Sequence, residues 1–245
     1  MDKDSLTRKE REIRDREQLI LDTARALLAT DGYQVFSMER IASEVEYSKG
    51  TIYNHFKSKE DVLSTLCCHS LWSLSSLFER AHHYPGNSRE KISALILGYA
   101  LHARLSPTDV QNMQSIKTQV MREKVSDELL HKLDQAEQKV ISFAQEIVMM
   151  ALNEGDLKIQ HESTVAEMIT GMWAMGHGSF LLNQTQIDFD NLGLVLPEKQ
   201  YLNNAQMLLD GYQWQPLSTN LDIDNYYLDI GKKIFPEEMK TLKLI

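Results

Sequence analysis

The 245-residue sequence contains only two cysteines, which are adjacent at positions 67 and 68. Neighbouring cysteines cannot supply a disulfide framework or a four-ligand zinc site, which excludes a cysteine-stapled secreted domain. No apolar run approaches the roughly 18 residues that cross a bilayer. The first residues, MDKDSLTRKEREIRDRE, alternate charges and lack the apolar core of a signal peptide. We therefore predict a cytoplasmic protein with reduced, buried thiols and no membrane partner.

Proline and glycine are also scarce, with five and 11 residues respectively. They lie mainly at the ends of segments whose apolar residues recur at three- and four-residue spacing, the period of amphipathic helices. Alternating patterns typical of strands are few and short. We predict an all-α protein, whose helices after the N-terminal region lie at 58–84, 88–104, 107–122, 125–153, 162–183 and 198–213.

Charge is distributed unevenly along the chain. The formal net charge is -9, yet residues 1–59 contain 11 basic and 11 acidic residues, and the 186 residues that follow hold 15 and 24. Residues 48–59, SKGTIYNHFKSK, carry three lysines and a histidine and no acid. A neutral N-terminal region and an acidic remainder indicate two parts with different partners.

The N-terminal region is divided into short helices by residues that begin or end them. The first helix is expected to place five apolar residues on one side: Ile13, Ile20, Ala24, Leu27 and Leu28. Gly32 is suited to end it in a left-handed conformation. Three serines are suited to cap the helices that follow: Ser37, Ser48 and Ser58. The helices after Ser37 and Ser48, joined by a bend at 45–47, have the proportions of a helix-turn-helix.

The helix that begins after Ser48 has an apolar and a polar side. Ile52 and Phe56 are four residues apart and are expected to face the core. The outward side then holds Lys49, Gly50, Tyr53 and Asn54, with Thr51 and His55 on its flank. Glycine lowers helix propensity by about 1 kcal/mol relative to alanine, which indicates close approach of another backbone. Lysines, hydrogen-bond donors and a slim helix face suit duplex DNA. The electrostatic attraction of DNA depends on this local positive charge rather than on the negative net charge of the chain.

Residues 20–66 resemble the DNA-binding domain of the TetR family of bacterial transcriptional regulators. The matching elements are A-x-x-L-L-A-x-x-G-Y at 24–33, the cap at 37, I-A at 41–42, S-K-G-T-I-Y at 48–53, H-F at 55–56 and K-S-K-E at 57–60. This resemblance covers about a fifth of the chain. It implies a homodimeric, all-helical regulator, most often a repressor that a small ligand releases from its operator.

Carried over by position, the resemblance assigns DNA contacts to this sequence. The residues expected to hold phosphates are Thr51, Tyr53, His55 and Lys59, with Ser37 contacting the DNA backbone at the head of the second helix. Lys49, Gly50 and Asn54 would face base edges. Basic residues at 8–16 could reach flanking DNA as part of an arm or helix extension at 1–18. The bend usually carries glycine where this chain has Glu46, so the backbone there is strained or the turn differs; Lys49 is the candidate partner for that acid.

We expect a DNA-binding domain at 1–66 and a larger helical domain for ligand binding and dimerisation at 67–245. The pair 162–183 and 198–213 is the candidate dimer surface, where Gly171, Gly176 and Gly178 permit close helix approach. The segment 216–245 is too apolar for a free tail and should pack on its own subunit or on the partner. Candidate contacts to a small apolar or amphipathic ligand are His102, Met113, Trp173 and His177, although residues of these types at helical spacing more often form plain core.

Two other functions remain open. A constitutive or partner-regulated DNA-binding protein would have the same N-terminal region without an enclosed ligand cavity. Glu79-x-x-His82 and Glu128-x-x-His131 have the spacing of metal ligands in helical bundles, but such a site needs two more buried acids, and Glu128 and His131 lie opposite the apolar face of their helix. No phosphate-cradling loop or nucleophile motif is present. We therefore expect no metal, no cofactor and no enzymatic activity.

Overall fold

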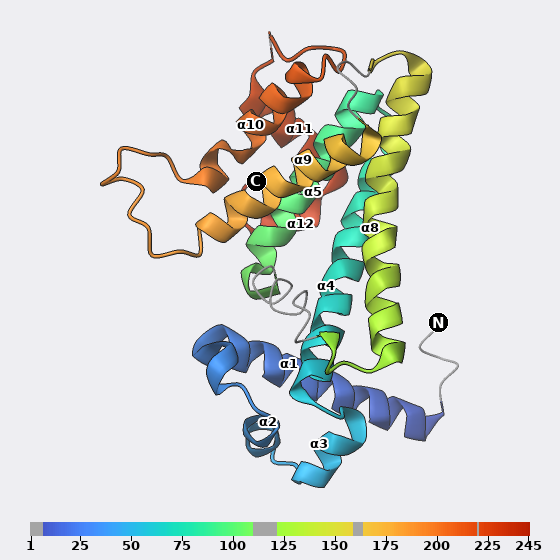
Figure 1. Ribbon diagram of the computed structural model, residues 1–245, viewed down its shortest axis with the longest axis vertical. Coiled ribbons are helices and arrows are strands. Elements are labelled where there is room, and N and C mark those ends of the chain that lie inside the picture. Colours follow the sequence, from blue (N-terminus) through green and yellow to red (C-terminus); the bar gives the residue numbers. More distant parts are fainter. Residues whose placement is uncertain (1–6, 110–121, 159–163, 220) are drawn as a thin grey trace. The chain divides into compact units, whose positions relative to one another are not determined.

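The computed structural model describes residues 7–109, 122–158, 164–219 and 221–245, and the regular structure in these ranges is all helical (Figure 1). The all-α prediction is therefore confirmed. The helices are α1 (Arg8–Val35), α2 (Met38–Glu44), α3 (Lys49–His55), α4 (Lys59–His82), α5 (Ser88–Leu105), α8 (Asp127–Glu154), α9 (Val165–Leu182), α10 (Pro197–Gly211), α11 (Ile223–Ile234) and α12 (Pro236–Thr241).

The chain divides into two compact units. The N-terminal unit comprises Met1–His69 and Asn112–Leu133, and the C-terminal unit comprises Ser70–Gln111 and Asp134–Ile245. Both α4 and α8 contribute residues to each unit. Cys67 and Cys68 are buried in α4, as predicted. Across the described ranges, no helix combines the length and the apolar character that crossing a membrane requires.

In the N-terminal unit, serine hydroxyls fix the starts of three helices. The hydroxyl of Ser37 accepts a hydrogen bond from the backbone N–H of Arg40 at 3.2 Å. Ser48 accepts in the same way from Thr51 at 3.1 Å, and Ser58 from Asp61 at 3.0 Å. Each bond satisfies an amide that has no partner within its helix. All three predicted serine caps are confirmed.

The apolar side of α1 is shorter than the sequence suggested. Ile20, Ala24, Leu27 and Leu28 are buried as predicted, but Ile13 is 39% exposed. Ile13 belongs to the first part of α1, residues 8–19, in which no residue is buried, so the helix begins well before the part that packs. At its other end, Gly32 interrupts the helical backbone with φ 72° and ψ 174°.

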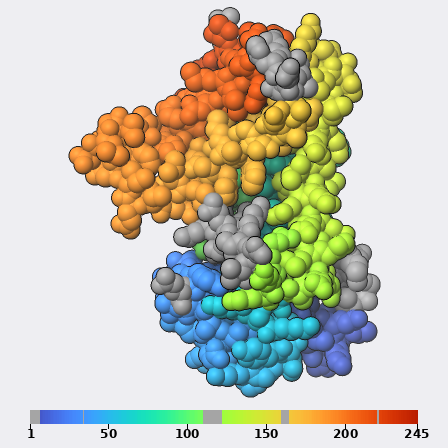
Figure 2. All heavy atoms as spheres, viewed as in Figure 1, coloured from blue at the N-terminus to red at the C-terminus, as the bar shows by residue number. Residues whose placement is uncertain are grey.

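The C-terminal unit is built around α5, which is buried on nearly every side. Helices α9, α10, α11 and α12 all pack against it (Figure 1). The predicted helix boundaries lie close to those observed for α4, α5, α8, α9 and α10, whereas the predicted helix at 107–122 falls mostly outside the described residues. The connection between α9 and α10, orange in Figures 1 and 2, projects from the rest of this unit.

A buried arginine ties α5 to α10 and to the segment after it. The Arg89 side chain is 1% exposed and forms an ion pair with Asp210 at 2.6 Å. It also donates to the side-chain oxygen of Gln206 at 2.8 Å and to the backbone carbonyl of Trp214. Gln206 in turn donates to the hydroxyl of Tyr227 in α11 at 2.8 Å. A buried cation is tolerated only when it is paired and hydrogen-bonded in this way.

The segment 216–245 packs on its own chain. It forms α11 and α12, whose buried residues include Tyr227, Ile230, Ile234 and Met239. The Phe235 side chain is completely buried between the two helices and α5. This answers a question that the sequence left open, because its apolar content required burial without saying on which surface.

Candidate nucleic-acid interface

Helices α2 and α3 are joined by a tight turn whose hydrogen bonds define its geometry. The N–H of Tyr47 donates to the carbonyl of Ala42 at 3.0 Å, and that of Glu46 donates to Ser43 at 3.3 Å. This is the Schellman pattern that closes a helix C-terminus, and it requires a left-handed residue directly after the C-cap. Glu46 occupies that position with φ 56°. The strain expected for a non-glycine residue in this bend is therefore present.

The short helix α3 presents its polar side outward. Ile52 is completely buried and Phe56 is 7% exposed, so they form the inner side. Lys49, Gly50, Tyr53 and Asn54 are all exposed. The structure therefore brings together, on one surface, the four residues predicted to face outward. Helix α3 packs against α2 and forms the second helix of a helix-turn-helix (Figure 1).

Nothing within the described chain requires glycine at position 50. A Cβ atom built there would meet only the Ser48 hydroxyl oxygen, at an ordinary contact distance of 3.8 Å. The residue lies inside α3 and is exposed. Glycine is unfavourable in such a place by about 1 kcal/mol. Packing within the described chain therefore does not explain the glycine, and its predicted contact with DNA stays a prediction.

Lys49 pairs with an acid, but not with the one that the sequence suggested. Its Nζ atom lies 3.4 Å from Oε1 of Glu39 in α2, rather than beside Glu46. The pKa of the Glu39 carboxyl is held below its usual value, chiefly by a hydrogen bond from the backbone N–H of Glu39 and next by the hydrogen bond and positive charge of Lys49. Both side chains are more than half exposed, so the pair is weak and can open when a phosphate competes.

The flanking residues have different surroundings. The hydroxyl of Thr51 lies 2.8 Å from that of Ser48, at the start of α3. The Nζ atom of Lys59 lies 4.3 Å from the centre of the Tyr33 ring, a cation–π arrangement that orients the lysine. The His55 side chain is only 9% exposed, and its Nδ1 lies 3.5 Å from Glu17 of α1. This placement argues against the predicted phosphate contact, because the His55 ring is turned toward α1 and is mostly shielded from solvent.

The basic residues near the N-terminus belong to α1. Arg8, Lys9, Arg11, Arg14 and Arg16 are all exposed along its first turns. Arg8 forms an exposed ion pair with Glu12 at 2.9 Å. In the part of the chain that the structure describes, these residues therefore form an extension of the helix rather than an extended arm.

Comparison with known proteins identifies this architecture. The model of the bacterial regulatory proteins of the tetR family matches residues 20–66. The N-terminal region of the chain is the DNA-binding domain of a tetR family transcriptional regulator. The chain is also 26% identical, over 139 residues that cover 57% of this chain and 69% of the relative, to the fatty acid metabolism regulator protein of Bacillus subtilis. The regulator binds DNA through the helix-turn-helix of α2 and α3 and, like its family, is not an enzyme.

Solved structures of the family share the fold. A tetR family regulatory protein from Rhodococcus RHA1 superposes with a TM-score of 0.62 at 14% identity, covering 80% of this chain and 96% of that one. The regulator FadR from Bacillus subtilis, solved in complex with stearoyl-CoA, gives 0.61 at 17% identity, covering 79% and 98%. The fold is thus shared over most of the chain, well beyond the DNA-binding motif.

Three of the four residues predicted to contact a ligand lie in the C-terminal unit. His102 is 4% exposed, and its Nε2 lies 2.9 Å from the hydroxyl of Ser70. Nδ1 of His177 lies 3.1 Å from the hydroxyl of Tyr99, and its ring lies 5.7 Å from that of Trp173. Met113 lies outside the described residues. A ligand role for these four stays a prediction.

The metal-ligand spacings lead to no metal site in the described chain. Glu128 and His131 are exposed, as predicted, and Glu128 pairs with Lys132 at 2.7 Å. Nε2 of His82 lies 3.0 Å from Glu146. Among the residues that the structure describes, no three histidine, cysteine or acidic side chains are grouped closely enough to hold a metal ion.

Proposed function

We propose that this tetR family regulator is a homodimeric repressor that an acyl-chain ligand releases from its operator. The observation that carries the DNA-binding part is the outward side of α3, where an exposed glycine with room for a side chain lies among Lys49, Tyr53 and Asn54. Such a surface fits the major groove of duplex DNA. A cytoplasmic location follows from this function.

In this proposal, each exposed residue of α3 has a distinct role. Lys49, Gly50 and Asn54 face base edges, while Tyr53, Thr51 and Lys59 hold phosphates, and Ser37 contacts the DNA backbone at the start of α2. His55 has a different role from the one that the resemblance suggested: its contact with Glu17 positions α3 against α1. We place the domain boundary near residue 66, within α4, so that 1–66 binds DNA and 67–245 dimerises and binds the ligand.

The exposed sides of α9 and α10 support a homodimer. Trp173 of α9 is 51% exposed and Met207 of α10 is 71% exposed. A Cβ atom on Gly178 would meet nothing within 4 Å, whereas Gly176 packs closely on Tyr201 inside the chain. The two helices also expose Ala174, Leu182, Asn204 and Gly211, and their exposed charged residues, Glu167 and Lys199, lie in the first turn of each helix. Exposed large apolar side chains with few charges among them are typical of an interface between identical subunits.

The dimer can be tested by placing a charge in this surface. Met207→Lys should convert the dimer to a monomer in sedimentation experiments. It should also weaken operator binding, because a monomer contacts only one of the two half-sites. Met149→Lys is the matched control, since Met149 is 47% exposed on α8 outside this surface. A monomeric wild-type protein, or equal behaviour of the two variants, would overturn the assignment.

The acyl-chain ligand is supported by the relatives named above. One regulates fatty acid metabolism and one was solved with stearoyl-CoA. Selection from a random duplex library gives an operator, and fluorescence anisotropy then measures its affinity with and without stearoyl-CoA and decanoate. We expect a loss of operator affinity of about 5–150-fold with at least one of them. Unchanged affinity with both, while the operator stays bound, would favour constitutive DNA binding instead.

A further inference from the structure

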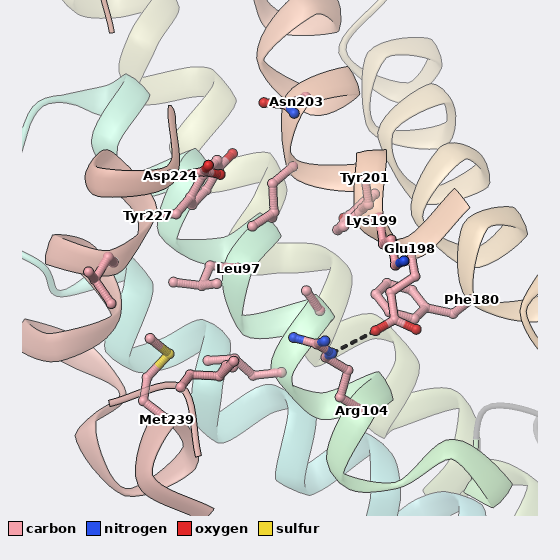
Figure 3. A pocket seen from close by; sticks show the side chains of 15 residues that line it. Leu97, Arg104, Phe180, Glu198, Lys199, Tyr201, Asn203, Asp224, Tyr227 and Met239 are labelled. Atoms are coloured by element: carbon pink, nitrogen blue, oxygen red, sulfur yellow. Dashed lines mark ion pairs between the residues drawn. The ribbon is translucent and has the colours of Figure 1, made fainter. Parts of the chain in front are cut away.

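The C-terminal unit contains a cavity of about 330 Å³ between α5, α10, α11 and α12 (Figure 3). The end of α9 contributes Phe180 to its wall. This volume lies at the lower end of the range of about 300–1,000 Å³ that small-molecule sites occupy. The cavity therefore suits a small ligand and is too small to enclose a whole coenzyme A thioester.

The walls of the cavity are mainly apolar. Leu97 and Leu101 of α5 form one side, and Leu228 of α11 and Met239 of α12 form the other. Burial raises the pKa of Tyr227, another lining residue, so its hydroxyl is neutral at pH 7. The middle of the cavity therefore offers a hydrocarbon surface without charge, and an unbranched aliphatic chain complements it.

One end of the cavity is cationic. Arg104 and Lys199 both line it, and Nε of Arg104 lies 2.7 Å from Glu198. Figure 3 shows that the terminal nitrogens of Arg104 point away from Glu198 and toward the space between α5 and α12. The other oxygen of Glu198 accepts a hydrogen bond from Asn183 at 2.5 Å. Two cations and one anion leave an excess positive charge at this end.

The opposite charge lies elsewhere in the lining. Asp224 is found beside Tyr227, apart from Arg104 and Glu198 (Figure 3). A ligand with a carboxylate at one end of an apolar chain is therefore favoured in one orientation only. A cationic headgroup at the arginine end would be repelled, and an uncharged chain would leave the spare donors of Arg104 without an acceptor.

We propose that this cavity binds a medium-chain carboxylate, with its carboxylate held by Arg104 and Lys199 and its chain between α5 and α12. The inference rests on the proposed function, in that it gives the acyl-chain ligand a site. The ligand carboxylate competes with Glu198 for Arg104. Because Glu198 lies in the first turn of α10, whose exposed side belongs to the proposed dimer surface, binding acts directly on that helix.

Isothermal titration calorimetry of the full chain with decanoate tests the site. Decanoate should bind once per chain, whereas decanol should bind at least tenfold more weakly and decyltrimethylammonium should not bind. Arg104→Met should weaken decanoate binding by about tenfold, as expected for loss of a charge-assisted hydrogen bond. Lys132→Met, an exposed lysine outside the cavity, should change nothing.

Glu198→Gln separates a binding role from a structural one. Removing this carboxylate leaves Arg104 without its competitor, so decanoate should bind several-fold more tightly. If the Arg104–Glu198 pair served only to hold α5 to α10, both substitutions would weaken binding. Equal losses in the two variants, or no binding of decanoate to the wild type, would overturn the proposal.

A measurement on protein with its charged residues intact excludes misfolding of a variant as the cause of weaker binding. In protein labelled with methyl-¹³C methionine, the Met239 resonance, assigned from Met239→Leu, should shift on addition of decanoate. A shift confined to other methionines would place the ligand elsewhere and overturn the cavity assignment. Decanoate that fills the cavity without changing operator affinity would leave this inference standing and show that the ligand does not release the DNA.

Discussion

The ammonium group of Lys49 lies 3.4 Å from the carboxylate of Glu39, which joins the first residue of α3 to the start of α2. The pair restrains the lysine that we place at base edges, and it puts an acid beside the DNA. Glu39→Gln preserves the size of the side chain and removes its charge. Affinity for the operator should rise several-fold at low salt, and the gain should shrink as added salt screens the acid.

Glu44→Gln is the matched control for this change. Glu44 is exposed at the other end of α2, so its substitution alters the net charge of the helix equally and leaves the Lys49–Glu39 pair intact. Anisotropy titrations over a range of salt concentrations compare the two variants. Equal gains would mean that overall charge, and not the release of Lys49, controls the affinity.

Glu46 provides a test of backbone strain. Its φ of 56° falls in the left-handed region, which is unfavourable for a residue with a Cβ by about 1–2 kcal/mol. Glu46→Gly relieves that strain but increases the freedom of the unfolded chain. The net result should be stabilisation of the N-terminal unit by about 0.5–1 kcal/mol, measured by chemical denaturation.

Glu46→Ala distinguishes strain from charge. Alanine removes the carboxylate and keeps the Cβ, so its stability should stay at or below that of the wild type. If both variants gained stability equally, repulsion of the glutamate and not its backbone conformation would be the cause.

Local features of the fold could be predicted from the sequence. The caps at Ser37, Ser48 and Ser58 and the break at Gly32 depend on residues within three or four positions, so their geometry follows from neighbouring side chains alone. The outward side of α3 was predictable for the same reason, since Ile52 and Phe56 fix which side is buried. The strained turn was found because Glu46 stands where the family has glycine.

Contacts between distant residues could not be predicted. Arg89 meets Asp210, and Arg104 meets Glu198, only after the chain has folded back on α5. An isolated arginine in an amphipathic pattern gives no sign of its partner. Lys49 shows the same limit at shorter range, because both Glu39 and Glu46 were close in sequence and only the packing of α2 decided between them. The cavity was missed because its lining comes from five separate segments.

The buried ion pair of Arg89 predicts a large effect on stability. Arg89→Met removes the cation and its hydrogen bonds to Gln206 and the Trp214 carbonyl, and leaves Asp210 with Ser218 as its donor. Breaking one partner of such a network should lower the free energy of unfolding by about 3–5 kcal/mol. Urea denaturation followed by circular dichroism measures this value.

Arg80→Met is a matched substitution in a more exposed place. Arg80 pairs with Glu238 of α12 at 2.5 Å, but its side chain is 37% exposed. Water can replace part of this interaction, so the loss should be no more than about 1 kcal/mol. A loss for Arg89→Met as small as that for Arg80→Met would show that Arg89 is not needed to hold α5 and α10 together.

His102 predicts how stability depends on pH. Burial lowers its pKa to about 4, so the folded protein does not take up this proton until well below the ordinary pKa of a histidine. The unfolded chain binds it near pH 6.5. The free energy of unfolding should therefore fall as the pH drops from about 6.5 to 4, by roughly 3 kcal/mol from this group.

His102→Gln should remove most of that dependence while leaving a side chain that can still bond Ser70. Part of the pH dependence should remain, because burial also lowers the pKa of His82. His131→Gln, on the exposed side of α8, is the control for the loss of a histidine. Unfolding curves recorded between pH 4 and 7 compare the three proteins. A His102→Gln profile that matches the wild type would mean that His102 is not the group responsible.

Gly50 predicts opposite effects on stability and on DNA binding. Alanine fits the chain there, with the nearest atom 3.8 Å away, and has the higher helix propensity, so Gly50→Ala should stabilise the protein by about 0.5–1 kcal/mol. The added methyl group stands where we place the base edges, so operator affinity should fall by about tenfold, or 1.4 kcal/mol. Gln145→Ala, at an exposed position of α8 outside both the DNA-binding and the proposed dimer surface, should leave DNA binding intact. A stabilised Gly50→Ala protein that binds its operator normally would show that DNA does not approach α3 at this point.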